Sequence, residues 1–166
     1  MLDPQILNTI VNISVRDIVI NHLDNKKFDS NLFYKILYTC IGFSTYFIFT
    51  SKFSINQITN QKLSKAFNTC NKFGTMLIVK GFLEKKINKE YLYTVFCTLI
   101  GFTVYHIFIE EYLDNFTILE KRLVFFITKD IIVSILKKKP YNIFDFEDSI
   151  GISLYNLIVK KIIFFN

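Results

Sequence analysis

The stretch that most constrains the fold is a run of 19 residues without a formal charge, from Tyr91 to Ile109. A helix needs about 20 predominantly apolar residues to cross the hydrocarbon core of a bilayer. Tyr91 and Tyr93 stand at one edge of the run and Tyr112 lies just beyond the other, as in an interfacial aromatic belt. The run therefore predicts a membrane-spanning helix.

A six-residue motif inside this run occurs three times in the chain. Ile-Gly-Phe-Thr-Val-Tyr at 100–105 is matched by Ile-Gly-Phe-Ser-Thr-Tyr at 41–46 and Ile-Gly-Ile-Ser-Leu-Tyr at 150–155. Residues four apart share a helix face, so each glycine lies beside its own tyrosine. Such a glycine offers a notch for close helix approach, which membrane helices favour; a ligand site built on the tyrosines is the alternative. The predicted packing positions are Gly42, Tyr46, Gly101, Tyr105, Gly151 and Tyr155.

The spacing of the motif indicates a larger internal repeat. Its copies stand 59 and 50 residues apart, which fits the scale of helix-pair repeats. We therefore predict an all-α fold: a helical membrane protein with one domain over 1–166, built from about three degenerate helix-pair units at 4–53, 63–113 and 117–166. If the glycines act as notches, Gly101→Leu should disrupt packing far more than Gly81→Leu.

A second candidate span covers residues 32–50. Sixteen uncharged residues separate Lys35 from Lys52, and lysines at both ends of a slightly short span can extend to the interface. A third span at 149–166, where the last copy of the motif lies, is an open alternative. The other apolar segments carry internal charges, so we expect those helices to lie at the interface.

The net charge is concentrated between the two better spans. Of the formal charge of +6, residues 52–90 supply eight lysines against two acids, and the flanking segments are balanced. Residues 51–71 are polar and 73–83 are too short to span, so we predict a basic connection on the cytoplasmic or matrix side, flanked by antiparallel spans. The predicted lipid-headgroup contacts are Lys52, Lys62, Lys65, Lys72, Lys80, Lys85, Lys86 and Lys89.

An alternative topology has two crossings per repeat unit and six in all, with the motif copies parallel. Arg16-Asp17 and Lys129-Asp130 would then lie in crossing helices. Each charge at mid-membrane costs roughly 2.5–3.5 kcal/mol on insertion scales, so two crossings are favoured, with three as a further alternative.

No pattern in the sequence indicates catalysis. His106 is the one histidine within the best span, and we interpret it as a hydrogen-bonded structural histidine, with a proton or metal role as the alternative. The three cysteines have no metal-ligand spacing. The basic segment has no arginine and few aromatic residues, which argues against nucleic acid. We therefore expect no enzyme activity, cofactor, metal or small-molecule substrate.

The function that fits these features is a non-catalytic integral membrane protein, a structural or assembly subunit of a larger complex. Its expected partners are the lipid bilayer and other protein subunits. The abundance of Phe, Ile, Asn and Lys indicates an A/T-rich genome, so a virion inner membrane or a mitochondrial inner membrane is the expected location, and no secretory signal is visible. The alternatives are a soluble all-helical repeat module that binds a partner protein and a small channel or carrier.

Overall fold

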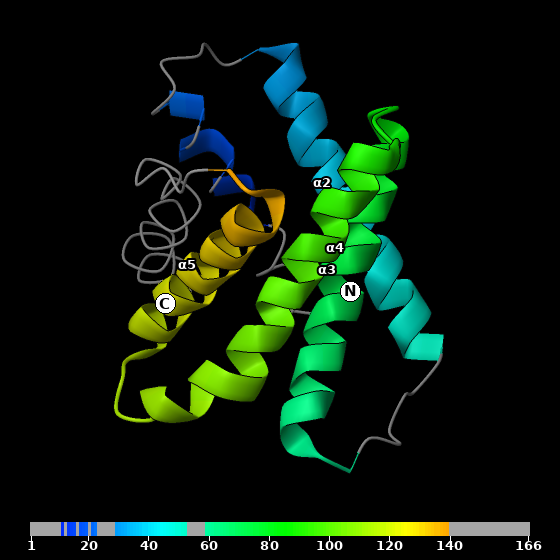
Figure 1. Cartoon of the computed structure of the whole chain (residues 1–166). Coiled ribbons are helices and arrows are strands. Elements are labelled where there is room, and N and C mark those ends of the chain that lie inside the picture. The colour runs from blue at the N-terminus through cyan, green and yellow to red at the C-terminus, as the bar shows by residue number, and fades with distance from the viewer. Residues whose placement is uncertain are drawn as a thin grey trace.

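The computed structural model describes residues 11, 13–15, 17–19, 21–22, 29–52 and 59–139. Every regular element within these residues is a helix, which confirms the all-α prediction. The helices pack into a bundle (Figure 1). They are α2 (Ser30–Lys52), α3 (Gln61–Leu83), α4 (Lys89–Val104), the π-helix η1 (Tyr105–Ile109), the 3₁₀-helix η2 (Glu110–Leu113) and α5 (Ile118–Lys137), and the described residues between 11 and 22 are also helical.

Within the described residues, each of the α-helices α2 to α5 begins at a side chain that caps its first turn. The capping oxygens accept hydrogen bonds from backbone N–H groups two or three residues further on. These N–H groups have no partner within the helix, so a cap stabilises the helix start. The caps are Asp29 for α2, Asn60 for α3, Asn88 for α4 and Thr117 for α5.

α3 occupies the 61–71 part of the polar connection predicted over 51–71 and the whole of the short interfacial helix predicted over 73–83. One continuous helix of 23 residues covers Gln61–Leu83. It packs against both α2 and α4. The prediction of a basic loop is wrong. Average hydropathy combines the polar and apolar faces of a helix, so it does not reveal the apolar face by which α3 contacts its neighbours.

Successive helices run antiparallel to one another (Figure 1). Between α3 and α4, Cys70 Sγ lies 3.3 Å from Thr103 Oγ1, whereas the Tyr91 hydroxyl donates to the Leu77 carbonyl at 2.6 Å. Because α3 runs back along the bundle, α2 and α4 run in the same direction. The predicted antiparallel arrangement of the two spans is therefore wrong.

The interior of the bundle is built mainly from aromatic rings. Phe73 of α3 lies between Phe43 of α2 and Phe102 of α4, with ring centroids 5.8 and 4.7 Å away. Phe102 stacks on Phe125 of α5 at 4.7 Å, with 3° between the ring planes. A row of rings therefore joins α2, α3, α4 and α5.

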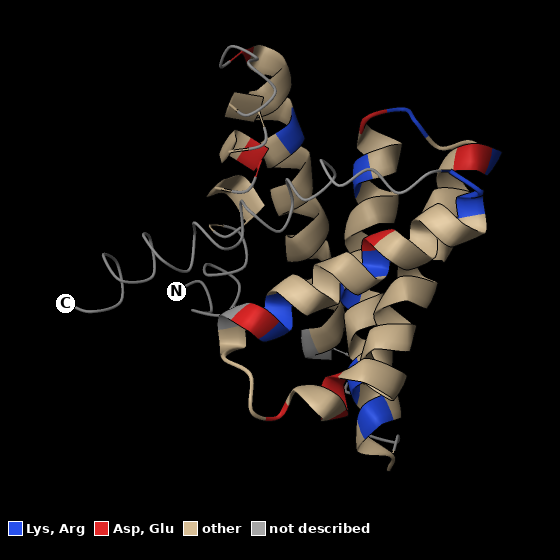
Figure 2. Cartoon of the chain, turned by 60° about the vertical axis from the view of Figure 1, so that its left-hand side comes forward, with Lys and Arg blue, Asp and Glu red and all other residues tan. Residues whose placement is uncertain are grey.

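Large apolar side chains also cover the outside of the bundle. Phe33, Ile48 and Phe49 of α2 and Phe96 of α4 are each more than half exposed. Two segments, Ser30–Thr50 and Lys89–Leu113, are long and apolar enough to cross a membrane, and of the 18 most apolar consecutive residues in each only 22% and 28% are buried within the protein. The charged residues of both helices lie towards their ends (Figure 2).

Candidate functional sites: glycine contacts and a polar cluster

Gly42 of α2 and Gly101 of α4 lie against the backbone of the helix that follows each of them. A Cβ on Gly42 would stand 2.8 Å from the Met76 carbonyl oxygen, and one on Gly101 would stand 2.8 Å from Lys129 Cα. Real Cβ atoms essentially never approach other atoms closer than 3.0 Å. Glycine is therefore required at both positions, because backbone atoms of α3 and α5 lie where a side chain would stand.

Two further glycines of the bundle have different neighbours. A Cβ on Gly74 would meet only the side chain of Leu99, at an ordinary 3.5 Å. Gly81 lies directly beneath the ring of Tyr91, whose hydroxyl is held by the Leu77 carbonyl. Gly81→Leu is therefore not the tolerated change that the sequence suggests, since a side chain there would displace this ring.

The two described tyrosines of the motif have different surroundings. Tyr105 is 4% exposed, its hydroxyl donates to the Lys121 carbonyl at 3.2 Å, and its ring meets Phe125 edge-on at 5.0 Å. Tyr46 is half-buried and lies edge-on to Phe47 at 5.3 Å. The third copy, with Gly151 and Tyr155, lies outside the described residues.

The glycine contacts join helices from different predicted repeat units. Gly42 joins α2 to α3, and Gly101 joins α4 to α5. The predicted boundaries between units fall between the two helices of each pair, at about 53–63 and 113–117. The division into units at 4–53, 63–113 and 117–166 stays a prediction.

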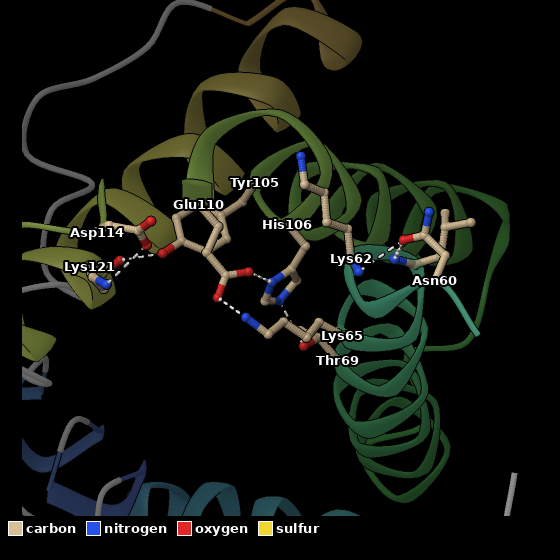
Figure 3. Close-up of polar contacts among 10 residues, drawn as sticks. Asn60, Lys62, Lys65, Thr69, Tyr105, His106, Glu110, Asp114 and Lys121 are labelled. Atoms are coloured by element: carbon tan, nitrogen blue, oxygen red, sulfur yellow. Dashed lines mark hydrogen bonds and ion pairs between the residues drawn. The ribbon is translucent and has the colours of Figure 1, made fainter. Parts of the chain in front are cut away.

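His106 is the centre of a polar cluster between α3 and the segment that continues α4 (Figure 3). Its Nε2 lies 2.9 Å from Thr69 Oγ1 and its Nδ1 lies 2.8 Å from one carboxylate oxygen of Glu110. The other oxygen of Glu110 accepts from Lys65 Nζ at 2.9 Å. The cluster therefore links α3 to η1 and η2 by three consecutive polar contacts.

The π-helix η1 supplies the local geometry of the cluster. The Glu110 N–H donates to the Tyr105 carbonyl, five residues earlier, in the wide turn that defines a π-helix. Within that turn the side chains of His106 and Glu110 come together, and they are 12% and 26% exposed. Both nitrogens of the imidazole have a hydrogen-bond partner, so the arrangement is a hydrogen-bonded link between the two helical segments.

The sequence points to His106 but not to its partners. Glu110 follows one turn later and can be anticipated, whereas Thr69 and Lys65 lie on another helix and carry no sequence signal. Within the residues that the structure describes, no three His, Cys, Asp or Glu side chains are grouped as a metal site would require.

The eight lysines predicted to contact lipid headgroups do not lie together on one loop. Lys62 and Lys65, in the first turns of α3, form ion pairs with Glu111 and Glu110. Lys72 lies in the middle of α3, with its ammonium group 5.7 and 5.5 Å from the centroids of two phenylalanine rings of α2. These three lysines take part in contacts between helices.

The lysines near the end of α3 form a separate group. Lys80 and Lys86 lie 3.9 and 2.9 Å from carboxylate oxygens of Glu84. The remaining members of the set are the exposed Lys85 and Lys89, and Lys52, whose side chain lies outside those described. Basic groups therefore occur at both ends of α3, in contrast to a loop on one side.

Comparison with known proteins gives no match: no family model, curated protein or solved structure is similar to this chain.

Proposed function

We propose that this chain is a non-catalytic integral membrane protein, a structural subunit of a larger membrane assembly. The observation that carries the proposal is the exposure of the two candidate spans: of the 18 most apolar consecutive residues in each, only 22% and 28% are buried. A core helix of a soluble protein would have most of such an apolar surface covered by its own chain. Lipid tails or the helices of other subunits can cover it instead.

The placement of charge in the middle of the helices agrees with this proposal. Lys129 and Asp130 of α5 form an ion pair at 2.6 Å, and their side chains are only 14% and 18% exposed. Lys72 of α3 is half-buried against aromatic rings. Ionisable residues within a membrane protein face the bundle interior and pair there, whereas soluble proteins place most of them outside.

The outer apolar faces supply the surface for assembly with other subunits. Both described glycine notches are filled within the chain, so they are not available to a partner. Exposed residues at helical spacing on α2, Phe33, Leu37 and Ile41, form a continuous apolar stripe. The A/T-rich residue usage favours a virion inner membrane or a mitochondrial inner membrane as the location.

A channel or carrier is less well supported. The cluster around His106 lies directly beside aromatic rings, with the Phe125 centroid 5.7 Å from the imidazole and Phe102 stacked behind it. Aromatic rings therefore lie beside this cluster on the side of α5, where a channel would need polar groups.

Membrane fractionation of the full chain tests the proposal. We expect the expressed protein to stay in the membrane pellet through high salt and alkaline carbonate, and to be released only by detergent. Recovery as a soluble monomer in plain buffer would exclude membrane insertion and favour the soluble helical module that binds a partner protein.

A further inference from the structure

A cavity of about 950 Å³ opens at the end of the bundle where α2 begins and α3 ends. Four lysines line it, Lys35 from α2 and Lys80, Lys85 and Lys86 from the end of α3 and the turn beyond. Two acids, Asp29 and Glu84, also line it, so among the described lining residues four positive charges minus two negative charges leave a formal charge of +2. The cavity is therefore suited to an anion.

The remaining walls give this cavity an amphipathic character. Tyr34 and Tyr38 lie one turn apart on α2 with their rings stacked, 5.9 Å between centroids. Leu32 and Leu83 add apolar surface. Glu84 holds Lys86 at 2.9 Å and Lys80 at 3.9 Å, which positions two of the ammonium groups along one wall.

We propose that this cavity binds the phosphate-bearing headgroup of an anionic phospholipid. Lysine is a strong point-charge partner for phosphate, and tyrosine hydroxyls and rings suit the interface between headgroups and acyl chains. The cavity lies at the first turns of a candidate span that begins at Ser30, which is the depth at which headgroups lie. Its volume falls within the range of about 300–1,000 Å³ typical of ligand sites. The inference rests on the proposed membrane location.

The end of the bundle that holds the cavity is basic as a whole. A test of the cavity therefore needs a control variant that removes equal charge from the same end but outside the cavity. Among the described side chains it carries eight lysines and three acids, a net +5, while the opposite end carries four basic and four acidic residues, a net charge of zero. Figure 2 shows charges at both ends of the bundle and a few in the middle of its helices. The members of the basic end are Lys35, Lys80, Lys85, Lys86, Lys89, Lys137, Lys138 and Lys139, with Asp29, Glu84 and Glu90. A basic end attracts anionic membrane surfaces without any cavity.

The experiment compares two triple variants that remove equal charge from the same end. Lys80→Gln/Lys85→Gln/Lys86→Gln alters the cavity, whereas Lys89→Gln/Lys138→Gln/Lys139→Gln leaves its lining intact. The full chain, purified in a neutral detergent, is titrated with short-chain phosphatidic acid and with phosphatidylcholine of the same chain length. We expect the cavity variant to bind phosphatidic acid about tenfold more weakly or worse, and the control to change by about twofold or less.

Three results would overturn the inference. Equal losses in both variants would show diffuse attraction to a basic surface. Equal binding of the two lipids would show that the charge of the headgroup is not recognised. Displacement of the lipid by inorganic phosphate at matched concentration would show a site for soluble phosphate compounds. If the triple variant does not fold, Lys85→Gln alone is compared with Lys89→Gln, because both side chains are exposed. Membrane fractionation does not depend on this site, so failure here leaves the proposed function standing.

Discussion

At the scale of single residues, the same amino acid has distinct roles at positions that look alike in sequence. Gly42 and Gly101 admit a neighbouring backbone, Gly81 admits a tyrosine ring, and Gly74 has space for a methyl group. None of them has a positive φ angle, so the requirement for glycine is one of space and not of backbone conformation. The consequences of substitution should follow the neighbour that each glycine meets.

Gly101→Ala should lower the free energy of unfolding by about 1–3 kcal/mol, because the added methyl group must move α5 away from α4. Gly42→Ala should behave in the same way between α2 and α3. Thermal unfolding of the detergent-purified protein, followed by circular dichroism, measures both effects.

Gly74→Ala is the matched control for these changes. Its methyl group would meet Leu99 at an ordinary 3.5 Å, and alanine is favoured over glycine within a helix by up to about 1 kcal/mol. We therefore expect no loss of stability, or a small gain. A loss as large as that of Gly101→Ala would contradict the close-approach account.

His106→Phe should lower stability by about 1–3 kcal/mol, because the half-buried Glu110 and Thr69 lose a hydrogen-bond partner. The assembled protein should still form, since the aromatic row around Phe125 remains. His22→Phe is the control, because His22 is exposed and should change stability by less than about 0.5 kcal/mol. An unchanged melting temperature for His106→Phe would show that the cluster contributes nothing to stability.

At the scale of elements, the capping residues determine where the helices begin. In this sequence they locate a helix start more reliably than average hydropathy does. Asn60 lies directly before α3, and Thr117 forms a capping box with Glu120 at the start of α5. Hydropathy nevertheless misses the helix at 61–83, because its lysines lower the average for a segment that packs against two neighbours. A search for caps would find its start.

Thr117→Ala should lower the free energy of unfolding by about 1 kcal/mol, because the first turn of α5 loses its cap. Thr98→Ala is the matched control: its hydroxyl donates to the Thr94 carbonyl within α4 at 2.9 Å, and alanine is the better helix former. Chemical denaturation of the two variants gives the comparison. Equal losses would mean that the cap does not define the start of α5.

The capping box also predicts a pH dependence. Hydrogen bonds from the Thr117 backbone N–H and hydroxyl hold the pKa of Glu120 below its usual value. The carboxylate therefore stabilises α5 above the ordinary glutamate pKa of about 4.3, and this contribution is lost as the pH falls through the lowered pKa. The stability difference between wild type and Glu120→Gln should be present at neutral pH and vanish in acid. If the stability difference between wild type and Glu120→Gln grew on acidification, the pH dependence would have the opposite sign and would contradict the capping box.

At the scale of the whole molecule, the sequence predicts the helices better than their arrangement. The predicted spans at 32–50 and 91–109 lie within the structural segments Ser30–Thr50 and Lys89–Leu113, since uncharged runs are local features. The direction of α4 relative to α2 depends on whether the intervening chain is a helix, which hydropathy alone does not reveal. The His106 cluster depends on Lys65, 45 residues from Glu110, and such a contact follows only from packing.

The antiparallel order of α2, α3 and α4 predicts a membrane topology that differs from that of a hairpin with two spans. Because α3 runs antiparallel to both α2 and α4, its two ends must lie on opposite sides of a membrane that α2 and α4 cross. Thr59→Cys and Lys86→Cys, each in a chain with Cys40, Cys70 and Cys97 replaced by alanine, should therefore react with a membrane-impermeant maleimide from opposite sides. The positive-inside rule places Lys86, at the basic end, on the cytoplasmic or matrix side.

Asn115→Cys provides an internal check, because the turn after η2 lies at the same end as the start of α3, where Lys65 meets Glu110. It should label from the same side as Thr59→Cys, and all three cysteines should react fully once detergent dissolves the membrane. If Thr59→Cys and Lys86→Cys react from the same side, α3 lies along the surface and the bundle does not form in the membrane. If they react from opposite sides but Lys86→Cys lies outside, the crossing of α3 holds and the charge of the basic end does not set the orientation.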